Sequence, residues 1–337
     1  MSNLIKQKPA TEPNEFQLKQ MKRKFGMFIH FGVNTFGNIE WSDGMIRAKS
    51  YQPETIDADS WAKTAYEAGM NFIILITKHH DGFCLWDTKY TDYCVRNSGN
   101  TTDVVAELSK ACKKYGLKLG LYYSLWDRKI PCYTENFKSG YLPYMRNQLT
   151  ELMDGRYGDI CELWLDGPWD KSRREWELDK LYDLVKRLQP ECQIGVNHTI
   201  GDNDGAEFPE ERWHPENYQP NDPIRMFPSD FRLWDGCMVR PDDPKIYTFQ
   251  NNKYYLPCEV TFCSREGFNW FYSNVYESEP LMDAQKMCND AKIVFDSDNI
   301  LVINLPVNTK GKLVDGDVEN LNKVSKMLGL NRKWEDK

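Results

Sequence analysis

Polar side chains suited to acid–base chemistry or metal binding follow several apolar runs of this 337-residue sequence. His30 ends an apolar run that begins at residue 25, and His79 and His80 follow the run 71–78. Later runs end in a second group of polar or aromatic residues: Tyr122, Tyr123, Ser124, Trp164, Asp166, Asn197 and His198. Four of the five histidines fall at run ends, and this concentration favours one functional site over chance scatter.

Asp166 is the most conspicuous carboxylate of this set. It ends the run 160–166 (ICELWLD) and shares strand parity with Trp164, so both side chains would point to the same face. An aspartate before a glycine is often only a turn former. A carboxylate beside an indole in an apolar environment is costly, however, unless it has partners or a chemical role. We therefore expect Asp166 to be functional.

Two chemistries use such a set of residues. Metal-dependent hydrolysis would take His30, His79, His80 and Asp166 as ligands. Neighbouring residues of a strand face opposite ways, which makes His79 and His80 a poor chelating pair. Glycoside hydrolysis would take two carboxylates, one as nucleophile and one as general acid and base. Aromatic residues make up 13% of the chain and could stack on sugar rings, so we favour the glycosidase, which needs no metal or cofactor.

Helix signals separate the apolar runs. Residues 57–69 begin with a capping aspartate and end in glycine, and residues 103–116 carry apolar residues at helical spacing. Further helices are predicted over 144–155, 181–188 and 318–328. Strand, loop and helix repeat in steps of roughly 30 to 45 residues, which indicates βαβ units and a parallel sheet.

The predicted strands form a closed barrel. They cover 25–32, 71–78, 117–124, 160–166, 193–197, 231–235, 254–262 and 299–305. Continuous apolar runs without a glycine-rich phosphate loop favour a (β/α)8 barrel of the TIM type over an open dinucleotide-binding sheet. Residues 199–252 break the rhythm, so we expect an irregular second half with an insertion at the rim. One catalytic domain is predicted over 1–337, with a polar leader at 1–20.

Composition excludes several classes of protein. The net charge is −7 with no basic stripe, which disfavours a nucleic-acid partner. No apolar run approaches the ~20 residues of a membrane helix, and the first residues resemble no signal segment, so we expect a cytoplasmic protein without a membrane partner. The ten cysteines occur singly in apolar runs and are expected to be reduced. The oligomeric state stays open.

Several motifs resemble those of a known enzyme family. The run 78–92 (KHHDGFCLWDTKYTD), together with 28–32 (FIHFG), Glu40–Trp41, 120–124 (GLYYS) and 163–167 (LWLDG), closely resembles glycoside hydrolase family 29, the α-L-fucosidases. The resemblance implies a (β/α)8 barrel and a retaining hydrolase of α-L-fucosides, with Asp166 as nucleophile and a fucosylated oligosaccharide as substrate. It carries the sugar-binding role onto His30, Glu40, Trp41, His79, His80, Tyr122 or Tyr123, and Trp164.

The resemblance also suggests an acid/base residue. Family members often carry it in a Trp-Glu pair before a Trp-Gly-Tyr, and the nearest match here is Glu259, which follows the apolar run 254–258. Glu266 and Glu210 are the alternatives, and Glu40 could assist. Many relatives carry a β-sandwich after the barrel, which we do not expect in this chain. A non-catalytic sugar-binding descendant of the fold stays open as an alternative.

Overall fold

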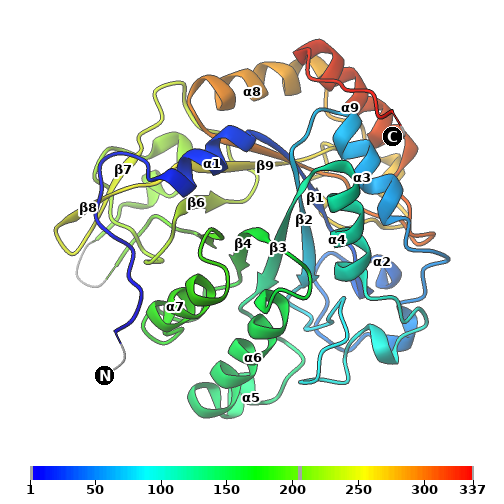
Figure 1. Cartoon of the computed structure of the whole chain (residues 1–337), viewed down its shortest axis with the longest axis horizontal. Helices are drawn as coiled ribbons and strands as arrows, with labels where there is room; N and C mark the ends of the chain where they lie inside the picture. Colours follow the sequence, from blue (N-terminus) through cyan, green and yellow to red (C-terminus); the bar gives the residue numbers. More distant parts are fainter. Residues whose placement is uncertain (1–2, 204–206, 336–337) are drawn as a thin grey trace.

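The computed structural model describes residues 3–203 and 207–335, and its centre is a closed barrel of parallel strands (Figure 1). Around the barrel the order is β1-β10-β9-β6-β5-β4-β3-β2. The strands are β1 (Phe25–Ile29), β2 (Phe72–Lys78), β3 (Lys118–Ser124), β4 (Ile160–Asp166), β5 (Gln193–Asn197), β6 (Phe231–Trp234), β9 (Cys258–Cys263) and β10 (Ile300–Asn304). The predicted (β/α)8 class is confirmed.

Helices surround the barrel on its outer side (Figure 1). They are α2 (Val33–Gly37), α3 (Ala58–Glu67), α4 (Val104–Tyr115), α5 (Cys132–Glu135), α6 (Leu142–Met153), α7 (Leu178–Leu188), α8 (Ala284–Asp296) and α9 (Asp315–Leu328). Local signals set their limits: the Asp103 side chain accepts a hydrogen bond from the Ala106 amide, and Gly116 ends α4 in the left-handed conformation. Apolar faces of these helices pack on the sheet and form the main core.

The inside of the barrel has a separate, smaller core. Aromatic and aliphatic side chains from several strands meet there: Phe28, Phe72, Ile74, Ile76, Tyr122, Trp164, Phe231, Leu233, Ile300 and Val302. Tyr122 of β3 pairs in register with Trp164 of β4, and Ser124 pairs with Asp166. The parallel register therefore brings the polar ends of these strands to one rim.

The leader contributes a helix that closes the amino end of the barrel. Asn14 and Gln17 form a capping box at the start of α1 (Glu15–Arg23). The Gln17 amide donates to the carbonyl oxygen of Asp230, directly before β6, and to that of Tyr255, three residues before β9. The prediction of a polar leader over 1–20 missed this helix, because its burial depends on the strand ends beneath it.

The segment 199–252 contains a barrel strand and an added layer. β6 confirms the strand expected over 231–235. β7 (Ile246–Phe249) and β8 (Asn252–Tyr255) form an antiparallel hairpin outside the barrel. The hairpin shares a third apolar cluster with residues of the insertion, including Tyr218, Ile224 and Phe227. The insertion thus brings a small core of its own.

The prediction of one continuous strand over 254–262 is wrong. The chain leaves the hairpin after Tyr255 and enters β9 at Cys258, with Leu256 and Pro257 between them. Glu259 is therefore the second residue of a barrel strand and does not end one. This position matters for the role predicted for it.

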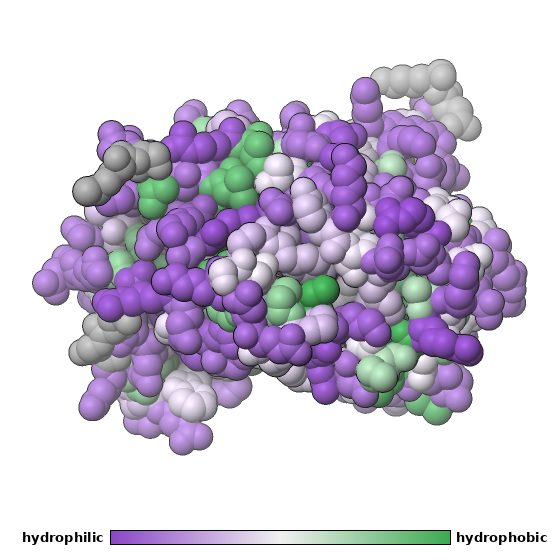
Figure 2. Space-filling model, turned by 90° about the horizontal axis from the view of Figure 1, so that it is seen from below, coloured by the Kyte–Doolittle hydropathy of each residue, from purple (hydrophilic) through white to green (hydrophobic). Residues whose placement is uncertain are grey.

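Figure 2 shows one face on which hydrophilic residues dominate and hydrophobic residues form small, separate groups. Among the described residues, no helix combines the length and the apolar character needed to cross a bilayer.

Candidate active site

A cavity of about 290 Å³ opens at the carboxyl ends of the barrel strands. Eight of the residues predicted from the sequence line it: His30, Glu40, Trp41, His79, His80, Tyr122, Trp164 and Asp166. Phe28, Asp235, Phe268 and Trp270 complete the lining. The register of the barrel has gathered residues that are far apart in the sequence, as expected for this rim.

Asp166 lies at the base of this cavity and is only 5% exposed. Its Oδ1 accepts hydrogen bonds from the Gly167 amide at 2.7 Å and from Asn197 Nδ2 at 2.9 Å, and its Oδ2 accepts one from the Tyr122 hydroxyl at 2.7 Å. The carboxylate of Asp166 thus has three hydrogen-bond donors around it. They hold it in one orientation, as a nucleophile requires.

Gly167 is essential to that arrangement. Its φ is +70°, and a Cβ at this position would lie 2.8 Å from the Trp126 Cβ and 3.0 Å from the Trp126 amide nitrogen. Glycine adopts this conformation without strain. The sharp turn after β4 therefore directs the Gly167 amide at the carboxylate of Asp166.

His80 contributes an unprotonated nitrogen beside Asp166. The Ser124 hydroxyl donates to the Trp126 carbonyl oxygen, so it accepts from Nδ1 of His80 at 2.7 Å. Burial lowers the pKa of His80 to about 4, so the ring is neutral near pH 7. Nε2, which lies 3.6 Å from Asp166 Oδ2, is then free to accept a hydrogen bond from a sugar hydroxyl.

His30 is held in the same way. Asn304 donates through Nδ2 to the Trp270 carbonyl oxygen, and its Oδ1 lies 2.7 Å from Nδ1 of His30. Nδ1 of His30 is thus the donor, and Nε2 is the acceptor that remains. Burial lowers the pKa of His30 to about 3. The pocket therefore presents neutral imidazoles.

His79 and His80 both reach the cavity, contrary to the argument from strand parity. β2 ends at Lys78, so the two histidines lie in the turn beyond it. Their rings are 4.1 Å apart between centroids. Lys78 instead points outward and forms a buried ion pair with Asp127 at 2.9 Å.

Glu40 extends into the cavity from the loop after β1. Its carboxylate accepts hydrogen bonds from the backbone amides of Trp270 at 2.8 Å and Phe271 at 3.1 Å. Burial raises the pKa of Glu40 to about 7, although these amides oppose the shift. Glu40 thus joins two loops of the rim and titrates near neutrality.

Asp235 is the functional candidate that the sequence interpretation missed. It follows β6 directly, lines the cavity, and accepts a hydrogen bond from Asn197 Nδ2 at 3.1 Å. Asn197 thus bridges Asp235 and Asp166. Burial and the charge of Asp166 raise the pKa of Asp235 well above its ordinary value. The signal was present in the sequence, because Asp235 ends an apolar run as Asp166 does.

Tyr123 does not belong to the site, which corrects one of the predicted residues. Successive residues of β3 face opposite sides, and Tyr122 takes the inner side. The Tyr123 hydroxyl donates to Gln148 Oε1 of α6 at 2.7 Å, and its ring lies in the core between sheet and helices.

The structure also corrects the position predicted for Glu259. This residue is fully buried near the amino end of β9, outside the cavity lining. It accepts a hydrogen bond from Trp164 Nε1 at 3.0 Å. Burial and the neighbouring Glu162 raise its pKa well above the ordinary value. A carboxyl group in this position has no path to a leaving group in the cavity.

The two alternatives to Glu259 lie outside the cavity. Glu266 is exposed in the loop after β9, and Glu210 is exposed in the short 3₁₀ turn Glu210–Arg212 of the insertion. Neither residue contributes to the lining. Glu40 and Asp235 are therefore the carboxyl groups that accompany Asp166 there.

The pocket donors do not converge as metal ligands. In the described ranges, the one group that brings three donor atoms within 4.8 Å of one another is His214, Glu216 and Cys237. None of these residues lines the cavity around Asp166. The geometry therefore favours the two-carboxylate chemistry over metal-dependent hydrolysis.

Comparison with known proteins agrees with the motifs. The family model described as Alpha-L-fucosidase matches residues 38–333. The chain is 31% identical to Alpha-L-fucosidase 1 of Arabidopsis thaliana over 97% of its own length and 62% of that protein's length. It is 30% identical to the putative alpha-L-fucosidase 1 of Oryza sativa subsp. japonica, over 92% of its own length and 57% of the relative's length.

Solved structures show the same barrel. A glycoside hydrolase 29 family member from an unknown rumen bacterium superposes with a TM-score of 0.78 at 28% identity, over 96% of this chain and 58% of that chain. A putative alpha-L-fucosidase from Bacteroides thetaiotaomicron superposes with a TM-score of 0.74 at 27% identity, over 95% of this chain and 69% of that chain. The chain thus spans somewhat more than half the length of several of these relatives.

Proposed function

Because the chain belongs to the alpha-L-fucosidase family, we propose that it is a retaining exo-glycosidase that releases α-L-fucose from oligosaccharides or glycoconjugates. The observation that carries this proposal is the geometry of Asp166. A carboxylate held by three donors at the base of a small cavity, with a second carboxyl group beside it, matches the requirement of double displacement.

In the first step, a carboxylate oxygen of Asp166 attacks the anomeric carbon of fucose. The bond from that carbon to the glycosidic oxygen breaks, and a glycosyl ester forms. The departing oxygen needs a proton, and Asp235 is the group suited to give it, since the neighbouring Asp166 disfavours its ionisation.

In the second step, a water molecule attacks the same carbon. Asp235, now ionised, takes a proton from the water, the ester bond breaks, and the Asp166 carboxylate is restored. Asn197 Nδ2 lies 2.9 Å from one carboxylate and 3.1 Å from the other. The bonded oxygens are therefore at most about 6 Å apart, compatible with the roughly 5–5.5 Å of retaining glycosidases.

Neutral imidazoles and Glu40 would bind the hydroxyl groups of fucose. Nε2 of His30 and of His80 accept hydrogen bonds, and the free lone pairs of Glu40 accept another. Trp270 and Phe28 offer apolar walls to the methyl side of the sugar. A site of this size suits one terminal monosaccharide.

The decisive experiment traps the ester. The protein would be incubated with 2-deoxy-2-fluoro-fucosyl fluoride, digested and analysed by mass spectrometry, and we expect the label on the peptide that contains Asp166. Nuclear magnetic resonance should detect α-fucose as the first product of an aryl α-L-fucoside. Fucose binding without turnover on any fucoside would instead identify a non-catalytic sugar-binding protein, and β-fucose as first product would exclude double displacement.

A further inference from the structure

A second cavity of about 660 Å³ lies beside the cavity that contains Asp166. An aromatic series joins the two: the ring of Trp169 lies 5.1 Å from that of His80 on one side and 5.9 Å from that of His198 on the other. His198 stacks on Trp234, with ring centroids 4.1 Å apart and planes 10° apart. A saccharide attached to fucose in the first pocket would extend over these rings.

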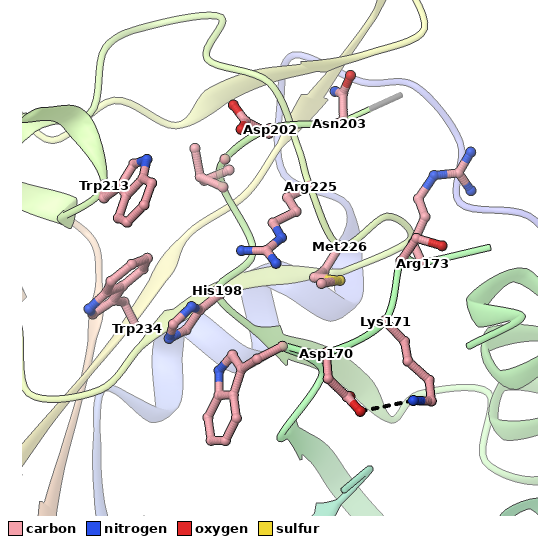
Figure 3. Close-up of a pocket in the computed structure, with 14 residues that line it drawn as sticks. Asp170, Lys171, Arg173, His198, Asp202, Asn203, Trp213, Arg225, Met226 and Trp234 are labelled. Carbon is pink, nitrogen blue, oxygen red and sulfur yellow. Dashed lines mark hydrogen bonds and ion pairs between the residues drawn. The ribbon is translucent and has the colours of Figure 1, made fainter. Parts of the chain in front are cut away.

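The guanidinium of Arg225 points into this second cavity toward His198 (Figure 3). Asp202 lines the same cavity, and its negative charge acts on Arg225. However, no carboxylate of the residues in 3–203 and 207–335 lies within 4.0 Å of the Arg225 guanidinium. Burial lowers the pKa of Arg225, because the partly buried cation has lost water, and the charge of Asp202 opposes this shift only in part.

The other two cationic side chains of the cavity wall, Lys171 and Arg173, already have acidic partners. Lys171 Nζ lies 2.8 Å from Asp170, which also accepts a hydrogen bond from the Tyr133 hydroxyl. Arg173 lies 3.6 Å from Asp179. Within the part of the chain that the structure describes, Arg225 therefore stands out as a cation aimed at the cavity without an ion pair.

We propose that Arg225 binds a carboxylate or sulfate group on the saccharide that carries the fucose. This inference rests on the proposed fucosidase function and specifies its substrate class. The planar guanidinium matches the two oxygens of such a group, and the flanking rings of His198, Trp213 and Trp234 supply stacking surfaces for the pyranose. The enzyme would thus prefer fucose attached to an acidic sugar.

A matched series of disaccharides tests this preference. The substrates are α-L-fucose linked to glucose, to glucuronic acid and to glucose 6-sulfate, with 4-nitrophenyl α-L-fucoside as the reference. We expect kcat/KM to be about tenfold higher for at least one anionic disaccharide than for the neutral one, the size of one charge-assisted hydrogen bond. The two anionic substrates distinguish a carboxylate site from a sulfate site.

Variants identify the residue responsible. Arg225→Gln should bring the anionic-to-neutral ratio of kcat/KM close to one, whereas Arg225→Lys should keep part of the preference. Lys113→Gln removes the same charge from the exposed face of α4 and should leave the ratio unchanged. Because each ratio compares substrates within one variant, a general loss of activity does not affect it.

Failure of this inference differs from failure of the proposed function. Hydrolysis of the reference and neutral substrates without any preference for the anionic ones overturns the role of Arg225 and keeps the fucosidase. A preference that survives Arg225→Gln overturns the assignment to this residue. If no fucoside is hydrolysed, the proposed function itself is wrong.

Discussion

Two pairs of carboxyl groups lie in the same barrel, one toward each end, and all of them except the partly exposed Asp235 are buried. Glu162 and Glu259 form the pair near the amino end, where Arg23 of α1 lies 2.8 Å from Glu162. Asp166 and Asp235 form the pair at the carboxyl end, joined through an amide side chain. In each pair, burial and the neighbouring charge raise the pKa of one member.

Access distinguishes the two pairs. The carboxyl-end pair lines a cavity, whereas Glu259 is fully enclosed beneath the indole of Trp164, and the charge of Glu162 is balanced by Arg23. A raised pKa therefore indicates a functional acid only where substrate can reach the group. The amino-end pair serves the fold, and the carboxyl-end pair suits chemistry.

Replacement of the proposed nucleophile should have the largest effect. Asp166→Asn keeps the shape and most hydrogen bonds but removes the attacking oxygen, so we expect kcat/KM on 4-nitrophenyl α-L-fucoside to fall by about 10⁴-fold or more. Glu259→Gln is the matched control from the other pair, because an amide can still accept from Trp164, and its activity should change only a few-fold. Equal losses in both variants would erase the functional distinction between the pairs.

Replacement of the proposed acid should depend on the leaving group. Asp235→Asn should lower kcat/KM by about 10²–10⁴-fold on fucosyl disaccharides, whose leaving groups need a proton. The loss should be much smaller on 4-nitrophenyl α-L-fucoside, since nitrophenolate departs unaided. An equal loss on both substrates would contradict the role of Asp235 as acid.

At the amino end, the expected effect is on stability. Arg23→Met leaves the buried Glu162 without its cation and should reduce the free energy of unfolding by about 3 kcal/mol in urea titrations. Lys110→Met breaks the exposed ion pair with Glu107 and should change stability by about 0.5 kcal/mol or less. The folded Arg23→Met variant should keep its activity. A selective loss of kcat would show that the carboxyl pair at the amino end of the barrel influences the reaction at the carboxyl end.

The smallest effect is expected at Glu40, the third carboxyl group of the rim. Its folded pKa of about 7 lies above the ordinary value, so the folded state holds a proton that the unfolded state releases. The stabilisation is complete below about pH 4.5 and is lost as pH rises toward 7. Between pH 4.5 and pH 7, the free energy of unfolding of the parent protein should fall by about 2 kcal/mol relative to that of Glu40→Gln, as measured by denaturation at several pH values. A constant difference would show that Glu40 does not titrate there.

Much of the fold could be predicted because its signals are local. β4 begins and ends as expected, and α4 lies between its predicted capping aspartate and terminal glycine. The missed elements depend on distant partners: α1 buries two polar residues, Gln17 and Gln20, against the strand ends, and the β7–β8 hairpin is stabilised by the core of the insertion. No local pattern distinguishes such segments from a leader or a loop.

The site could be predicted where a motif or strand parity fixed a side chain. Asp166 and Trp164 face the cavity as parity requires. Strand parity alone does not decide whether Tyr122 or Tyr123 faces the inside of the barrel, because it does not identify the inner face of β3. The position of Glu259 depends on where β9 begins, which is after Pro257. Asp235 was missed because its segment lacked a clear helix on either side, although it ends an apolar run.

The indole rings around the cavity have a practical consequence. Trp41 stacks nearly parallel on Trp169, with centroids 5.5 Å apart, while Trp164 and Trp270 line the cavity itself. A sugar that enters displaces water from these rings and alters their fluorescence emission. Binding to an inactive variant such as Asp166→Asn can therefore be followed by intrinsic fluorescence, without a labelled ligand and independently of turnover.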